Sequence, residues 1–199
     1  VLTSVKAKNP DMIYSVTFLN ELVPLTQQAR RDVGLNTLIL AIENNADPDY
    51  YKGVGTYGDG QVMESRFSPY AVPRGSTEEA TRQFLANFDK KYGGFAGMMG
   101  AATYESVYIT KAAIEDAGSI DKAKVRDALA TLSMPQMMEI MKGGTISFSP
   151  DYRESKFDRY VVQLAMDQAA GEPRPHIVWP ENLKDKEFVL PDWYTPGSS

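Results

Sequence analysis

Three glycines form the pattern in this chain that first suggests a binding chemistry. Gly53, Gly55 and Gly58 spell G-x-G-x-x-G within the segment 52–61, KGVGTYGDGQ. This spacing is typical of a dinucleotide-binding loop, but such a loop must follow a strand and open a helix, whose N-terminus meets the pyrophosphate. Here the glycines precede residues 61–67, QVMESRF, which alternate like a strand. The segment therefore predicts a mobile surface loop, and we expect no cofactor.

Two further residues could bind a ligand because each follows an apolar run. Glu43 comes directly after residues 37–42, TLILAI, and Phe18 ends residues 12–18, MIYSVTF. Glu43 could hold a cationic group by a charge-assisted hydrogen bond, or it could simply begin a solvated loop. Phe18 could be the apolar wall of a small-molecule pocket, or it could be a core residue. Both interpretations of each residue stay open on sequence grounds alone.

Catalytic and metal-binding chemistry find little support in the sequence. The chain has no cysteine and one histidine, His176, which stands between prolines and has no nucleophile pattern around it. The acidic residues Glu43, Asp47, Asp49 and Asp59 do not have the alternating spacing of an EF-hand calcium loop. We therefore expect neither a catalytic residue nor a metal site.

The overall composition excludes two other classes of protein. The net charge is −5 and no basic run occurs, which is the opposite of the balance that a nucleic-acid surface needs. No segment of the sequence approaches the roughly 20 apolar residues that span a bilayer. With 24% charged and 43% hydrophobic residues, the composition is that of an ordinary globular protein.

The first 60 residues predict a strand, a helix and a second strand, followed by a third strand after the glycines. The expected features are a buried strand over 12–18, a helix over 21–33 with Asn20 as N-cap and Pro24 in its first turn, a stop at Gly34, and strands over 37–42 and 61–67. A βαβ unit implies parallel pairing and a right-handed crossover. Ligands of such sheets collect beyond the carboxyl ends of the strands, which is where Phe18 and Glu43 stand.

The middle of the chain predicts three consecutive helices, which interrupt this alternation and indicate a different lobe. We expect helices over 77–92, 98–117 and 121–132, with a capping box from Ser76 and Glu79, an apolar face of Ala80, Phe84 and Phe88, and stops at Gly93 and Gly118. Strands are expected over 145–149, 160–166 and 176–180. The fold class is therefore α/β.

Three stretches resemble the type I periplasmic binding proteins, and more narrowly the branched-chain amino acid group that serves ABC transporters. They are residues 8–35, 102–129 and 144–173, with a strand-helix-"GL" unit, a "TY…A…AG…D…V…AL" helix pair and a late "G-x-I-x-F" hairpin. The resemblance covers nearly the whole chain but only the second half of the family's usual length. It implies a clamshell of two Rossmann-like lobes, here partial because the N-terminal half is absent.

The resemblance also implies a function and three site residues. Glu43 matches an acidic residue that holds the α-ammonium of the ligand, Phe18 matches an aromatic contact, and Met99 falls near another apolar contact. The implied protein is the substrate-binding component of an ABC transporter, periplasmic or extracellular, which delivers an amino acid to a membrane permease. Related members bind amides, urea or aromatic acids. The alternatives are a ligand-sensing receptor domain of the same fold and an α/β hydrolase-type enzyme.

The implied lobe assignment divides the chain into three parts. Residues 1–63 belong to the C-terminal lobe, residues 64–146 to the helical part of the N-terminal lobe with its crossing strands, and residues 147–199 return to the C-terminal lobe. The helices of the middle part would then lack the sheet of the absent half, which leaves apolar faces such as Phe84 and Phe88 uncovered. We expect association with the missing N-terminal fragment or oligomerisation through these faces.

Overall fold

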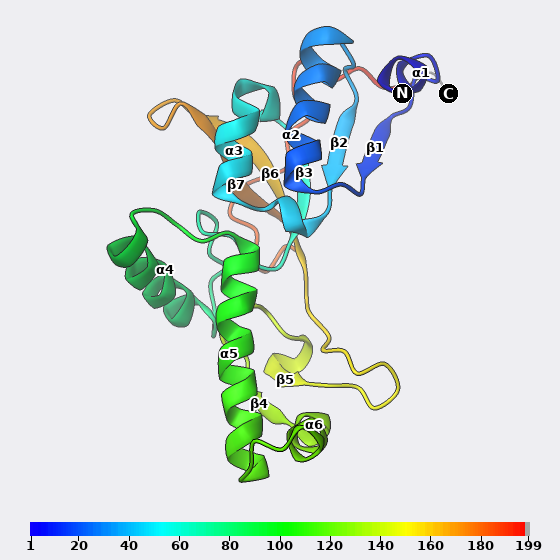
Figure 1. Cartoon of the computed structure of the whole chain (residues 1–199). Helices are drawn as coiled ribbons and strands as arrows, with labels where there is room; N and C mark the ends of the chain where they lie inside the picture. The colour runs from blue at the N-terminus through cyan, green and yellow to red at the C-terminus, as the bar shows by residue number, and fades with distance from the viewer. Residues whose placement is uncertain (198–199) are drawn as a thin grey trace.

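A five-stranded mixed sheet organises one end of the molecule in the computed structural model, which describes residues 1–197 (Figure 1). The strand order is β1-β2-β3-β6-β7, with β1 (Met12–Ser15), β2 (Leu38–Ala41), β3 (Val62–Ser65), β6 (Tyr160–Asp167) and β7 (Glu172–Trp179). The first three strands are parallel, and β6 pairs antiparallel with both β3 and β7. The predicted parallel βαβ unit is therefore confirmed.

The helix between the first two strands begins earlier than the sequence predicts. It comprises α2 (Leu19–Gln27) and a π-helical turn, η1 (Gln28–Asp32). Phe18, and not Asn20, is the N-cap residue, because the Glu21 carboxylate accepts the backbone N–H of Phe18 at 3.0 Å. Pro24 consequently lies inside the helix and not in its first turn. The helix ends as predicted at Gly34, whose φ of +61° suits glycine.

The glycine-rich segment is helical, so the prediction of a mobile surface loop is wrong. Residues 43–58 form η2 (Glu43–Asn45), α3 (Pro48–Val54) and η3 (Gly55–Gly58). Asp47 caps α3 by accepting the backbone N–H of Asp49 at 2.9 Å, and Pro48 follows it in the first helical position. The dinucleotide motif is absent from this geometry, because its glycines end a helix instead of opening one.

A hydrophobic core lies between the sheet and the helices α2 and α3. Its largest fully buried side chains are Tyr50, Tyr51 and Tyr160, which all have no exposed surface. Strand β1 lies at the edge of the sheet, so Met12 and Tyr14 are about half exposed and the prediction of a buried strand is wrong there. The C-terminal tail returns to this core region, where Arg30 covers the ring of Trp193 at 3.6 Å.

Three helices form the other end of the molecule, as predicted. They are α4 (Glu78–Tyr92), α5 (Met98–Ala117) and α6 (Lys122–Thr131), with a small hairpin of β4 (Ser133–Pro135) and β5 (Thr145–Ser147) and the turn η4 (Lys142–Gly144). Gly93 and Gly118 end α4 and α5 in left-handed conformations. The capping box is wrong: Thr77 is the N-cap of α4, and the Ser76 hydroxyl instead accepts from the Gln136 amide at 2.5 Å.

A second hydrophobic core covers the face of α4 that the sequence left without a partner. Phe84 is only 7% exposed, and its ring lies 6.1 Å from that of Phe67 and 4.9 Å from that of Tyr104. The prediction of an uncovered Phe84 is therefore wrong, and Ala80 is exposed and does not share its buried face. The division into lobes and the association of the chain with a partner remain predictions.

Candidate ligand-binding site

Phe18 and Glu43 follow the adjacent parallel strands β1 and β2, so both lie beyond the carboxyl ends of the strands, on the same side of the sheet. The strand ends Ser15 and Ala41 are paired in the register of β1 and β2, so the segments after them leave the sheet side by side. The Asn45 side-chain amide donates to the carbonyl of Thr17 at 2.9 Å and ties these two segments together. Phe18 itself is 69% exposed, so its ring is not a core residue.

The N-terminus of α5 reaches the same edge from the helical end of the molecule. The backbone N–H of Met98 donates to the carbonyl of Ala46 at 3.4 Å, next to η2. Gly97 lies so close to Asp47 that a Cβ there would come within 1.8 Å of its Oδ2. We call this contact of Gly97 and Met98 with Ala46 and Asp47 the joint between the two ends of the molecule. Met98 is buried there, whereas Met99 is 59% exposed. The structure thus joins the segments that carry all three predicted site residues.

Glu43 stands between two arginines that the sequence reasoning did not identify. Its Oε2 lies 3.6 Å from Nε of Arg66 and 3.5 Å from Nε of Arg159. This oxygen is buried and forms no hydrogen bond within the described part of the chain. The Arg159 side chain is 53% exposed and also lies 3.9 Å from Glu64. Glu43 is therefore an ion-paired carboxylate whose outer partner is accessible to solvent.

Arg66 connects Glu43 to a second carboxylate. Its Nε lies 2.8 Å from Oε1 of Glu139, and its guanidinium lies 4.1 Å from the centre of the Phe157 ring. Its side chain is only 16% exposed. The sequence does contain a signal for Arg66: it directly follows β3, just as Glu43 closely follows β2, and so lies at the carboxyl ends of the same parallel strands. Glu139 belongs to an irregular segment far along the chain, and no spacing rule relates it to Arg66.

Glu139 and Glu105 form a buried acidic pair behind Arg66. They are 3% and 1% exposed. Oε1 of Glu105 accepts the backbone N–H groups of Met138 at 2.5 Å and Glu139 at 2.8 Å. Burial raises the pKa of Glu139 to about 8, an effect that Arg66 opposes and the charge of Glu105 increases. Burial also raises the pKa of Glu105, while the two backbone donors oppose it. Burial thus shifts the pKa of both carboxyl groups upward, and only that of Glu139 is raised as far as about 8.

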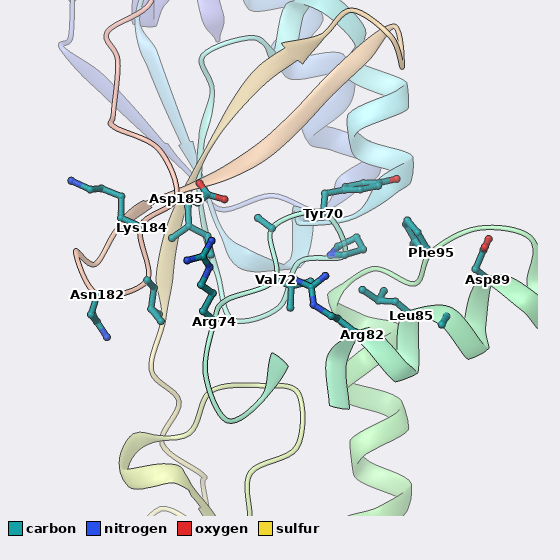
Figure 2. Close-up of a pocket in the computed structure, with 15 residues that line it drawn as sticks. Tyr70, Val72, Arg74, Arg82, Leu85, Asp89, Phe95, Asn182, Lys184 and Asp185 are labelled. Atoms are coloured by element: carbon teal, nitrogen blue, oxygen red, sulfur yellow. The ribbon is translucent and has the colours of Figure 1, made fainter. Parts of the chain in front are cut away.

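A separate cavity of about 910 Å³ lies between α4, the segment after β3 and the segment after β7 (Figure 2). Tyr70 and Phe95 contribute aromatic rings 5.7 Å apart. Its charged lining residues are Arg74, Arg82, Lys184, Asp89 and Asp185. Because both signs are present and Lys184 is already ion-paired with Glu181 and Glu187, this lining selects no single ligand chemistry. None of the three predicted site residues lines it.

Two kinds of feature are absent from the part of the chain that the structure describes. Residues 1–197 contain no group of three or more His, Asp or Glu side chains arranged to hold a metal ion. None of the helices within that range is both long and apolar enough to cross a membrane.

Comparison with known proteins identifies similar sequences and folds. The family model described as periplasmic binding protein matches residues 1–170. A leucine-binding protein from Thermotoga maritima has a TM-score of 0.68 at 22% identity, over 92% of this chain and 48% of its own. A solute-binding protein of an ABC transporter from Rhodopseudomonas palustris BisB5, in complex with 3,4-dihydroxybenzoic acid, has a TM-score of 0.70 at 19% identity, over 88% and 46%. A search of the curated proteins gives no match.

A third structure broadens the range of ligands among these relatives. A solute-binding protein from R. palustris in complex with benzoate has a TM-score of 0.67 at 13% identity, over 92% of this chain and 48% of its own. The chain spans about half the length of the solved structures that it matches. These likenesses confirm the expected α/β fold of the type I periplasmic binding proteins over that half.

Proposed function

The chain belongs to the periplasmic binding protein family, and on this premise we propose that it is part of the substrate-binding component of an ABC transporter. In this role it captures a small polar ligand, an amino acid, between two lobes and delivers it to a membrane permease. The family implies a periplasmic or extracellular location, and its members are solute-binding proteins and not enzymes. A ligand-sensing receptor domain would use the same site, and one solved relative is described as an extracellular ligand-binding receptor.

The position of Glu43 carries the proposal. Its carboxylate lies beyond the carboxyl end of a parallel strand, and its buried Oε2 has ion-pair contacts but no hydrogen bond within residues 1–197. An α-ammonium could supply the missing hydrogen bond. Because the Arg159 side chain is half exposed, its guanidinium can turn from Glu43 to the ligand's carboxylate when the ammonium arrives. Glu43 and Arg159 together suit a zwitterion.

The apolar part of the ligand would contact Phe18 and Met99. Both side chains are more than half exposed, so a ligand can cover them without displacing a core residue. Benzoate, which a relative binds, carries a carboxylate but no ammonium. At this site it would leave the hydrogen bond to Glu43 unmade and would place two carboxylates close together. The charges therefore favour an amino acid over an aromatic acid.

Isothermal titration calorimetry with L-leucine and with benzoate tests the proposal. We expect saturable binding of L-leucine, weakened by about 2–5 kcal/mol in Glu43→Gln, as for truncation of one partner of a buried charge pair. The control variant is Glu115→Gln, which removes an exposed carboxylate near the far end of α5. Unchanged affinity in Glu43→Gln would remove Glu43 from the site. Binding of benzoate but not of L-leucine would overturn the proposed ligand class.

A further inference from the structure

Arg66 is one partly buried cation shared between two carboxylates. Its Nε lies 2.8 Å from Glu139 and 3.6 Å from Glu43, so the contact with Glu139 is the closer one. Within the described chain, neither this Nε nor the facing oxygens of the two carboxylates form an aligned hydrogen bond. The guanidinium is therefore attracted to both carboxylates without a fixed hydrogen bond to either. A change of charge at one carboxylate will alter the strength of the ion pair between Arg66 and the other carboxylate.

The other contacts of Arg66 permit a small displacement. Its guanidinium lies over the face of Phe157, and its Nη2 lies 3.6 Å from the sulfur of Met98. A ring face and a thioether are soft partners that do not require one fixed donor direction. Since Arg66 is mostly buried, its charge acts on nearby acids with little screening by solvent.

The acid beyond Arg66 is poised to exchange a proton. Glu139 is faced by Arg66 after β3, by Glu105 of α5, by Glu43 of η2 and by Tyr160 of β6. Arg66 is the cation among these groups, and the two glutamates favour protonation of Glu139. Two neighbouring buried carboxyl groups of this kind titrate as a unit and retain a shared proton more readily than isolated groups do.

We propose that Arg66 couples ligand capture at Glu43 to a proton on the Glu105–Glu139 pair. When the ammonium of a ligand binds Glu43, it neutralises that carboxylate and replaces Arg66 there, so that Arg66 is left paired with Glu139 alone, which it already contacts at 2.8 Å. The pair then releases one proton to solvent and becomes the counter-charge of Arg66. Arg66 is thus a positioning residue that leaves Glu43 available for the ligand. This inference rests on the proposed function, because it assumes a ligand with an ammonium group.

The direction of the resulting pH dependence follows from the charges. Without ligand, the pKa of Glu139 is about 8, so the pair is protonated near neutral pH. The charge of Glu43 raises this pKa and that of Arg66 lowers it, so a ligand that neutralises Glu43 and leaves Arg66 to Glu139 alone lowers the pKa of Glu139. Such a ligand releases a proton in the pH interval between the pKa values of the free and the bound state. Affinity therefore rises with pH across this interval, by up to about tenfold per pH unit for one proton, and levels off above about pH 8.

A titration that needs no ligand tests the coupling. Glu43→Gln removes the competing carboxylate, as a bound ammonium would neutralise it. We expect the carboxyl carbon resonances of Glu105 and Glu139, assigned with Glu→Gln variants and followed by NMR, to titrate at lower pH in Glu43→Gln and at higher pH in Arg66→Gln. The control, Glu64→Gln, removes an acid that contacts Arg159 but has no ion pair with Arg66, and should leave the titration unchanged. An unchanged titration in either of the first two variants would overturn the coupling.

Calorimetry separates failure of the coupling from failure of the proposed function. L-Leucine is titrated into the protein near pH 7 in buffers that differ in ionisation enthalpy. We expect the observed heat to depend on the buffer with the sign of proton release, and this dependence to disappear in Glu139→Gln. Binding without proton release overturns the coupling and leaves the function intact. Absence of L-leucine binding overturns the function, while the carboxyl titration still decides whether Arg66 links the two acids.

Discussion

Gly97 is the position where one methyl group should disturb the joint that holds the candidate site together. It precedes α5 as its N-cap residue, and its backbone is extended, so alanine is allowed by conformation. The obstacle is packing, since an added Cβ would lie 1.8 Å from Oδ2 and 2.7 Å from Cγ of Asp47. Asp47 must therefore move in Gly97→Ala. Its other carboxylate oxygen, Oδ1, accepts the backbone N–H of Asp49 and so caps α3, and we expect the movement to disturb this hydrogen bond.

The cost can be estimated from these contacts. Loss of an N-cap hydrogen bond destabilises by about 0.5–2 kcal/mol, and insertion of a methyl group into a filled space by about 1–3 kcal/mol. We expect Gly97→Ala to lower the free energy of unfolding by about 2–3 kcal/mol. Asp47→Ala alone should cost about 1 kcal/mol, because it removes the cap but creates no clash. In the double variant the contacts with Oδ2 and Cγ are gone and only the Cβ of residue 47 remains, at 3.1 Å, so the second change should add little.

Urea unfolding followed by circular dichroism measures all four proteins of this cycle. The prediction is a coupling energy of at least about 1 kcal/mol between positions 97 and 47. Gly53→Ala is the control, since a Cβ there meets only the side chain of Val23, at 3.3 Å, inside a helix that favours alanine. If the double variant loses as much free energy of unfolding as the two single variants together, within about 0.5 kcal/mol, the contact between Gly97 and Asp47 does not join the two parts of the molecule.

Three other predictions concern buried and exposed groups of known surroundings. Tyr50→Phe should lower the free energy of unfolding by about 1–2 kcal/mol in urea titrations, because the Tyr50 hydroxyl hydrogen-bonds to two side chains. Tyr51→Phe should be neutral or stabilising, because the buried Tyr51 hydroxyl has no hydrogen-bond partner within residues 1–197. The stability of the folded chain should fall as pH rises from about 4.5 to about 8, since burial raises the pKa of Glu139 and the folded state therefore binds an extra proton. The unfolding temperature of Glu139→Gln should depend on pH much less steeply across this range. An equally steep dependence in the variant would contradict the raised pKa of Glu139. Phe18→Ala should leave the unfolding midpoint nearly unchanged, because Phe18 is 69% exposed. The same variant should weaken L-leucine binding by about 1–2 kcal/mol in calorimetry. Loss of stability without loss of affinity would show that Phe18 has a structural role and does not contact the ligand.

The sequence predicted those elements whose signals are local. The parallel βαβ unit follows from two apolar runs flanking an amphipathic helix, and the bounds of α5 from a long periodic segment stopped by Gly118. The sequence reading does not find helix α3, because it predicts a mobile surface loop over the glycine-rich segment 52–61 and no helix before it. Its signal was nevertheless present, since Asp47 followed by Pro48 is typical of a helix start. The core position of Tyr50 depends on that helix and could not be predicted without it.

The electrostatics of the site could not be predicted, because they depend on contacts distant in sequence. Glu43 can be identified from its place after a strand, but one arginine partner directly follows β3 and the other directly precedes β6. Only the fold brings Arg159 to the same edge as Glu43. The burial of Glu139 likewise depends on how an irregular segment packs against α5, which no periodicity encodes.

The most direct test of the central claim is to locate the bound ligand on the protein. ¹H–¹⁵N correlation spectra recorded during titration with L-leucine would report on every backbone amide. We expect shifts concentrated at residues 17–20, 43–46 and 98–100, which lie where the ends of β1 and β2 meet the start of α5, and loss of these shifts in Glu43→Gln. Shifts concentrated instead at residues 70–74 and 182–185, along the cavity of Figure 2, would contradict the assignment of the site to Glu43.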